Sequence, residues 1–257
     1  SKILKPARSS LRRRFGETRI EFIAKLTNIK YMLWRSPEGL YFMMRYPYNL
    51  DYLIVSLVHE PEVSHIFRPK QGEVVIDVGA HIGAYAIRAA KAIGEKGLVI
   101  ALEPDPQNFA LLGMNVKLNK LSKVITLRMA AWESDGSFIM HRSAKSGSHS
   151  LVRVPEEFIG ETKVPTITLD ALVRRFNLNR VDWVKIDVEG AELAVLRGAN
   201  KTLQLAKNLI VEVWHKHADG IFNLLRQTGH EITVLSRGKL FIYILAKGRH
   251  RPHHMNA

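Results

Sequence analysis

The sequence predicts an α/β protein with a doubly wound sheet of seven strands, mostly parallel, that ends in an antiparallel hairpin. From residue 72 onward, short apolar strands alternate with helical segments, as parallel α/β units require. The first strand begins with Val74, Val75 and Ile76, a β-branched run typical of a strand buried on both faces. The final strands, 231–235 and 239–246, are joined by a junction short enough for a hairpin, so we expect them to pair antiparallel.

The other elements follow from apolar periodicity and from turn residues between them. Strands are expected at 74–77, 98–102, 124–129, 138–141, 164–167, 181–186 and 209–213. Helices are expected at 18–34, 50–67, 82–93, 106–119, 170–176, 191–196 and 219–228. Residues 142–163 are expected to form a polar loop. We divide the chain into a basic extension with helices and an aromatic hairpin (1–70), a main domain (71–247) and a basic tail (248–257).

The loop after the first strand has the features of a ligand-binding turn. Asp77 closes the strand, and Gly79 and Gly83 frame a tight turn before a helix whose N-terminus offers free N–H groups. The spacing is not that of a dinucleotide loop, and His81 and Ile82 would crowd a pyrophosphate. A ligand with a carboxylate, an amine and a sulfonium fits better, because Asp77 can meet the positive charge. The loop alone also fits an ordinary strand–turn–helix corner.

A second acid strengthens this interpretation. Glu103 ends the next strand about 20 positions past the loop, where a carboxylate accepts both ribose hydroxyls of an adenosine. Asp105 is placed to cap the following helix, and Pro106 to begin it. Past the third strand, Ala131 is expected near the adenine, and a backbone carbonyl or Glu133 near its amine. The sequence therefore predicts a nucleoside cofactor at the carboxyl ends of the strands.

Charge and composition limit the environment of the protein. The 257 residues carry a net charge of +14, and residues 1–30 hold nine Lys or Arg against two Glu. Such an arm suggests an anionic membrane surface or RNA as a partner, or else a solvated tail. The absence of cysteine excludes disulfides and thiol nucleophiles. No run reaches the roughly 20 apolar residues of a membrane span, so we expect a cytoplasmic protein, with peripheral membrane attachment left open.

Several motifs together resemble the FkbM family of class I S-adenosylmethionine-dependent methyltransferases, which have a Rossmann-like fold. The matching stretches are Asp-Val-Gly-Ala-His-Ile-Gly from residue 77, Thr-Leu-Asp from residue 168, Val-Asp-Trp-Val-Lys-Ile-Asp-Val-Glu-Gly-Ala-Glu from residue 181, and Val-Leu-Arg-Gly-Ala from residue 195. The resemblance covers roughly residues 70–215. One departure is His81, where the family usually has Asn.

The resemblance implies S-adenosylmethionine as methyl donor, S-adenosylhomocysteine as product, and O-methylation of a small-molecule, sugar or lipid-linked acceptor. The extension lies outside the shared core, so the identity of the acceptor does not carry over. The residues expected to contact the cofactor are Asp77, Gly79, Ala80, His81, Gly83, Glu103, Asp105, Ala131 and Asp187.

Three acids follow the fourth main strand. Asp187 ends this strand, and Glu189 and Glu192 lie within one turn of it. Carboxylates so close repel one another unless a cation, a proton or a hydrogen-bond donor intervenes. Our hypothesis is that Asp187 or Glu189 deprotonates the acceptor hydroxyl, or that they hold a divalent cation that does so, although we assign no metal ligands. The alternative is that Glu189 and Glu192 only anchor the loop and cap the next helix.

Other candidates are less specific. His215 follows the fifth strand and is the best neutral-pH base, while His149 in a Ser/Gly loop is placed to reach the acceptor, as are Glu192 and Tyr46. Either histidine can equally be structural. A buried Glu212 would need a partner, for which Lys185 is the candidate. The competing functions are an RNA methyltransferase that uses the basic arm and a non-catalytic binding protein on the same fold, and the oligomeric state is open.

Overall fold

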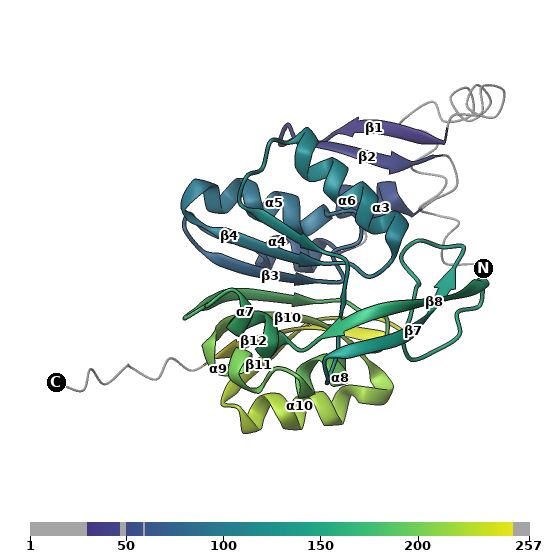
Figure 1. Cartoon of the computed structure of the whole chain (residues 1–257). Helices are drawn as coiled ribbons and strands as arrows, with labels where there is room; N and C mark the ends of the chain where they lie inside the picture. Colours follow the sequence, from purple (N-terminus) through teal and green to yellow (C-terminus); the bar gives the residue numbers. More distant parts are fainter. Residues whose placement is uncertain (1–29, 47–49, 59, 249–257) are drawn as a thin grey trace.

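The computed structural model describes residues 30–46, 50–58 and 60–248. Its centre is a seven-stranded sheet in the order β11-β12-β10-β9-β3-β4-β5 (Figure 1). Neighbouring strands are parallel except for β12, which pairs antiparallel with both β10 and β11, as the short junction predicted. The strands are β3 (Val74–Val78), β4 (Leu98–Leu102), β5 (Val124–Leu127), β9 (Val181–Ile186), β10 (Ala206–Trp214), β11 (His230–Arg237) and β12 (Phe241–Gly248).

Helices cover both faces of this sheet, and each face has its own apolar core. One face is covered by helices that lie together in the upper part of Figure 1: α3 (Asp51–Ser56), α4 (Pro61–Ile66), α5 (Ala84–Ile93) and α6 (Pro106–Leu118). The other is covered by α7 (Leu169–Arg175), α8 (Glu192–Arg197), α9 (Asn200–Leu205) and α10 (Ala218–Gln227). The short 3-10 turns are η1 (Gly94–Lys96) and η2 (His215–His217). The doubly wound α/β prediction is therefore confirmed.

The chain changes direction across the sheet between β3 and β9, which are neighbours in space but far apart in sequence. At this point the backbone N–H of Asp187 donates a hydrogen bond to the Val78 carbonyl at 3.1 Å. Gly79 lies so close that a Cβ added to it would be 1.9 Å from the Asp187 carbonyl oxygen. Glycine is required there, both for this approach and for its φ of +80°. Ligands of open α/β sheets bind at such crossover points.

The extension differs from its prediction. Residues 31–34 belong to β1 (Tyr31–Arg35), which pairs antiparallel with β2 (Tyr41–Arg45), so this part of the predicted helix 18–34 is wrong; residues 18–29 lie outside the described residues. The helix was predicted from apolar residues spaced three to four apart. In its last part the side chains instead alternate between exposed and half-buried, as in a strand. The predicted helix 50–67 is instead α3 and α4, because Leu57 adopts a left-handed conformation with φ 56° and Pro61 begins a new helix.

Hydrogen bonds attach this extension to the C-terminal end of helix α6, which packs on the main sheet. The side chain of Asn115 in α6 accepts from the Met43 N–H at 2.6 Å and donates to the Met43 carbonyl at 3.1 Å. Asn119 makes the same pair of bonds to Tyr41, at 2.8 and 2.7 Å. The side chains of Phe42 and Met44 are buried in the core that α5 and α6 share. The predicted domain boundary at residue 70 remains a prediction.

A second sheet of three strands has the order β6-β8-β7 and lies beside the carboxyl edge of the main sheet (Figure 1). It contains β6 (Ala130–Ala131), β7 (Gly136–Ser143) and β8 (Phe158–Ile167). The predicted polar loop is therefore shorter, spanning residues 144–157, because both strands extend into it. Helix α9 was missed, since its six residues are too few to show a helical period. No helix in the described ranges is long and apolar enough to cross a membrane.

Candidate active site

A cavity of about 360 Å³ lies at the carboxyl ends of β3, β4, β9 and β10. Its walls come from the loops after these strands, from helices α3 and α5, from β12 and from the loop 144–157. Of the predicted site residues, it is lined by Asp77, Gly79, Ala80, His81, Glu103, Ala131, His149, Asp187 and Glu189. The structure thus brings together most residues that the sequence placed at the strand ends.

Asp77 lies fully inside the protein at one end of this cavity. Neither of its carboxylate oxygens has a hydrogen-bond partner within the described part of the chain. Burial raises its pKa to about 6, while the nearby Lys185 ammonium acts in the opposite direction. A buried carboxylate without partners that faces a cavity is suited to a ligand that brings positive charge and hydrogen-bond donors.

Glu103 organises the loop between β3 and α5. Its two carboxylate oxygens accept from the His81 N–H at 2.8 Å and from the Asp105 N–H at 2.9 Å, which fixes the carboxylate at the edge of the cavity. Burial raises its pKa to about 7, against these hydrogen bonds. Oε1 also accepts a long contact from Asn108 Nδ2 at 3.4 Å. Oε2 therefore keeps a lone pair for one further donor, and Oε1 can take a second hydroxyl in place of the long Asn108 contact.

Asp105 acts as a structural support. It caps α6 by accepting from the Gln107 and Asn108 N–H groups, both at 2.9 Å, which confirms its predicted capping role. Its other oxygen accepts from Arg142 Nε at 3.1 Å. Asp105 is not among the residues that line the cavity, so it does not contact the space where a cofactor would lie.

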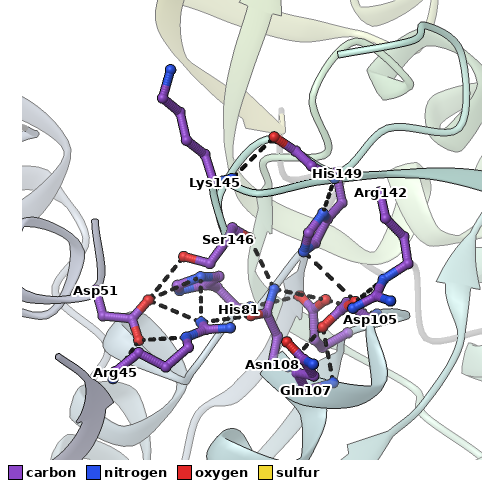
Figure 2. A network of polar contacts seen from close by, with 12 residues as sticks. Arg45, Asp51, His81, Asp105, Gln107, Asn108, Arg142, Lys145, Ser146 and His149 are labelled. Atoms are coloured by element: carbon purple, nitrogen blue, oxygen red, sulfur yellow. Dashed lines mark hydrogen bonds and ion pairs between the residues drawn. The ribbon is translucent and has the colours of Figure 1, made fainter. Parts of the chain in front are cut away.

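A polar network joins four segments beside Glu103 (Figure 2). Asp51 of α3 accepts from Arg45 Nε at 2.9 Å and from the Ser146 hydroxyl at 2.9 Å. Arg45 also donates to Asn108 Oδ1 at 2.7 Å, and Asn108 Nδ2 donates to the Ser146 carbonyl at 3.0 Å. Strand β2, helix α3, helix α6 and the loop 144–157 are thereby held in one arrangement around the site.

His81, which stands where the family usually has Asn, lies within this network. Its φ of 52° places it in the left-handed region, and its Nε2 lies 3.4 Å from the Arg45 guanidinium and 3.7 Å from Asp51 Oδ1. Burial lowers its pKa to about 4, so the ring is neutral near pH 7. The sequence did not indicate Arg45, Asp51 or Ser146, because their contacts join segments far apart in the chain.

The opposite end of the cavity is acidic. Asp187 Oδ2 accepts from the buried Lys185 Nζ at 2.9 Å. Glu189 has a left-handed φ of 54°, and its carboxylate accepts from Arg153 at 2.8 Å. Burial, followed by the charge of Asp187, raises the pKa of Glu189 to about 7. Cationic donors therefore separate these carboxylates, as their proximity required.

Two other acids have structural partners. Glu192 accepts from the Gly190 N–H at 2.8 Å, and it does not line the cavity, which matches the alternative in which it anchors the loop. Glu212 accepts from the Tyr243 hydroxyl at 2.8 Å, so the expected pairing with Lys185 is wrong. Antiparallel register places Glu212 directly opposite Tyr243, whereas Lys185 pairs with Asp187 instead.

Three of the remaining candidates, His215, Tyr46 and Gly83, do not line the cavity. His215 Nε2 lies 3.1 Å from the Gly238 carbonyl oxygen, and neither His215 nor Tyr46 lines the cavity. Gly83 also lies behind the lining, where it begins α5 with a φ of 97°. His149 does line it, and its Nδ1 accepts from the Ser143 N–H at 2.9 Å.

Across the described residues, no group of three or more His, Asp or Glu is placed to hold a metal ion, so the divalent cation is not supported.

The comparison with known proteins identifies the family. The profile of the methyltransferase FkbM domain matches residues 77–241. The chain belongs to the FkbM methyltransferase family. It is an S-adenosylmethionine-dependent methyltransferase, and the prediction made from the motifs is confirmed.

Two sequence relatives support this assignment, and a solved structure shows some similarity to the chain. The chain is 34% identical to the hexuronic acid methyltransferase AglP of Haloferax volcanii over 179 residues, which are 67% of this chain and 70% of that protein. It is 26% identical to the 2-O-methyltransferase NoeI of Sinorhizobium fredii over 170 residues, covering 60% and 68%. The crystal structure of precorrin-6y C5,15-methyltransferase from Geobacter metallireducens has 18% identity and a TM-score of 0.47, covering 76% of this chain and 89% of that one.

Proposed function

We propose that this FkbM methyltransferase methylates a hydroxyl oxygen of a small-molecule, sugar or lipid-linked acceptor. The observation that carries the proposal is the division of the cavity into two ends. Glu103 follows β4, and the carboxylates of Asp187 and Glu189 follow β9, on the other side of β3. The names of the relatives AglP and NoeI, one a hexuronic acid methyltransferase and the other a 2-O-methyltransferase, are consistent with a sugar acceptor.

The residues present fit S-adenosylmethionine. Glu103 would accept the ribose hydroxyls, and the partnerless Asp77 carboxylate would meet the positively charged amino-acid end. The backbone at Gly79 and Ala80 is held flat against β4, since both N–H groups donate to the Leu102 carbonyl at 3.0 and 2.9 Å. This leaves the loop surface open for close approach by the cofactor.

When bound, S-adenosylmethionine supplies a methyl group on a positively charged sulfur. The chain then has to align the acceptor oxygen with this methyl group and take the hydroxyl proton. Asp187 is the group we assign to the proton, because its carboxylate lines the cavity and Lys185 fixes it at 2.9 Å. Glu189 is the second candidate. Its pKa of about 7 lets it both accept and release a proton near neutral pH.

The test combines binding with turnover. Calorimetric titration with S-adenosylmethionine and S-adenosylhomocysteine measures cofactor binding, and release of S-adenosylhomocysteine measures transfer to a panel of glycosides and small alcohols. We expect Asp187→Asn to keep cofactor binding within about threefold but to slow transfer by about 100-fold or more. The asparagine amide oxygen still accepts from Lys185, so folding should be retained.

The matched control is Asp219→Asn, an exposed acid at the start of α10. It makes the same change of charge away from the cavity and should leave transfer unchanged. Full transfer by Asp187→Asn would contradict the assignment of the proton to Asp187. No binding of either cofactor form by the folded wild-type chain would contradict the proposed function itself.

A further inference from the structure

The acidic end of the cavity contains two buried pairs, each formed by a tyrosine and a glutamate. The Tyr85 hydroxyl donates to Glu60 Oε2 at 2.7 Å, and the Tyr243 hydroxyl donates to Glu212 Oε2 at 2.8 Å. All four side chains line the cavity, and none is more than 6% exposed. Burial raises the pKa of both tyrosines far above the usual range, so the phenols stay protonated and keep donating.

These pairs come from different parts of the fold. Glu212 lies two residues beyond Ile210, which is in register with Lys185, and Lys185 is in register with Asp77. Because alternate residues of a strand share a face, Glu212, Lys185 and Asp77 all point to the face covered by α3, α4 and α5. Glu60 immediately precedes α4 and approaches the cavity from that covering layer.

Of this covering layer, α3, α4 and Glu60 lie outside the part of the chain that matches the family profile, which begins at residue 77, whereas α5 lies within it. Besides Glu60, the layer contributes Leu50, Leu53 and Ile54 to the cavity wall. The acceptor end is therefore enclosed partly by residues within the matched range 77–241 and partly by residues of the extension. Residues of this wall are in a position to set acceptor specificity.

The acceptor end is rich in carboxyl groups. Its lining includes those of Glu60, Asp187, Glu189 and Glu212, and Lys185 is the sole lysine or arginine among the described residues that line the cavity. Burial, followed by the charges of Asp187 and Glu189, raises the pKa of Glu212 well above its usual range, so a further negative charge is disfavoured there. The Lys185 ammonium is already engaged, since it lies 2.9 Å from Asp187 Oδ2 and 4.6 Å from the Tyr85 ring centroid.

The chemistry of these groups selects the kind of acceptor. Ionised carboxylates only accept hydrogen bonds, so a bound molecule must offer donors. Hydroxyl groups offer them, whereas an ionised carboxylate or phosphate offers none and meets like charge in a buried site. The two phenol hydrogens are already donated to Glu60 and Glu212, so neither is available to an incoming anion.

We propose that Glu60 and Glu212, each held by its tyrosine, form an acceptor subsite that takes an uncharged polyhydroxyl compound and rejects one carrying a carboxylate or phosphate. The proposal rests on the proposed function and specifies its substrate class. It differs from what the name of AglP states for that relative, whose acceptor is a hexuronic acid. In the reaction, the acceptor oxygen forms a bond to the methyl carbon, the sulfur–methyl bond breaks, and the hydroxyl proton passes to Asp187.

The test uses matched pairs of acceptors on the full chain. The pairs are the methyl glycosides of glucose, galactose and mannose and the corresponding methyl glycosides of their uronic acids. Methyl transfer from S-adenosylmethionine is followed by mass spectrometry at pH 8. We expect the wild-type chain to methylate at least one neutral glycoside about 100-fold faster than its uronate partner.

Two variants assign this selectivity to the subsite. Glu60→Gln and Glu212→Gln keep an amide oxygen for the tyrosine hydroxyl, and each removes one acidic group from the cavity wall. Each should reduce the neutral-to-uronate ratio by about tenfold. Glu62→Gln, an exposed acid on α4, is the matched control and should leave the ratio unchanged.

Three results would overturn the proposal. They are a uronate methylated as fast as its neutral partner, a ratio that neither variant changes, and a chain that binds S-adenosylmethionine but methylates no neutral glycoside. Failure of the proposed function is distinguishable, because it appears in calorimetry as absence of cofactor binding. Transfer to the uronates alone would retain the methyltransferase activity and reject only this subsite.

Discussion

Replacing Glu103 by glutamine tests the cofactor end of the site. The carboxylate accepts two backbone N–H groups, from His81 at 2.8 Å and from Asp105 at 2.9 Å, and a long contact from Asn108 Nδ2 at 3.4 Å. One ribose hydroxyl would use the remaining lone pair of Oε2, and the other would replace the long Asn108 contact at Oε1. Glutamine keeps the shape but has a single acceptor oxygen and no charge. The variant should therefore lose both charge-assisted hydrogen bonds to the ribose.

The magnitude follows from these contacts. A hydrogen bond to a charged group contributes about 1.5–3 kcal/mol, and part of this remains when the amide oxygen replaces the carboxylate. We expect a net loss of about 2–3 kcal/mol, which is a 30- to 150-fold rise in the Kd of S-adenosylhomocysteine. The free energy of unfolding should change by less than about 2 kcal/mol. Two opposing effects keep this change small. The variant no longer has to keep a buried carboxyl ionised, whose pKa is raised to about 7, and this stabilises the fold. Its amide nitrogen faces a backbone N–H that the carboxylate had bound, and this destabilises the fold.

Calorimetric titration at pH 8 and urea unfolding measure the two quantities on the same sample. Glu95→Gln, an exposed acid in η1, is the matched control and should change neither. An affinity within threefold of wild type would refute the placement of the ribose at Glu103. A variant that loses binding because it unfolds would show that Glu103 holds the loop rather than the ligand.

Four further predictions concern the same site. Because burial raises the pKa of Asp77 to about 6 and of Glu103 to about 7, protonation competes with a cationic ligand; affinity for S-adenosylmethionine should rise from pH 5.5 to 8, and a flat calorimetric profile would contradict this. Between about pH 4 and 7 these two carboxyls bind more protons in the folded chain than in the unfolded one, so urea unfolding should show that they lower stability as pH rises through this range. Gly79→Ala should destabilise the chain by about 3 kcal/mol or more in urea unfolding, because its φ is +80° and the added Cβ would meet a backbone oxygen. The control is Gly113→Ala in α6, where the added Cβ has open space, and it should be neutral or slightly stabilising. Ser146→Ala removes a 2.9 Å bond to α3, and stopped-flow measurement should show S-adenosylhomocysteine leaving about fivefold faster; an unchanged rate would mean that the loop 144–157 does not retain the ligand.

The acids at the strand ends could be predicted because their placement depends on local pattern alone. Asp77, Glu103 and Asp187 each follow a short apolar strand, and the carboxyl ends of parallel strands meet at one edge of a sheet. The capping role of Asp105 is equally local, since its partners lie two and three residues away. Fold class and the core of the site therefore follow from the sequence without knowledge of long-range contacts.

The wall of the cavity could not be predicted in the same way. Glu60 and Arg45 reach the site only because the extension packs on α5 and α6, through contacts 25 and 63 residues apart in sequence. Glu212 was assigned the wrong partner, because its neighbour depends on the register between β10 and β12. His215 was selected for its titration range, yet the turn after β10 carries it to Gly238.

The most direct test of the account is a crystal structure of the chain with S-adenosylhomocysteine. The account predicts both ribose hydroxyls at about 2.7 Å from the Glu103 carboxylate, with the amino-acid end of the ligand beside Asp77 and Gly79. The sulfur should face Asp187 and Glu189 across the cavity. A ligand bound elsewhere, or with its ribose away from Glu103, would contradict the arrangement on which the proposed chemistry depends.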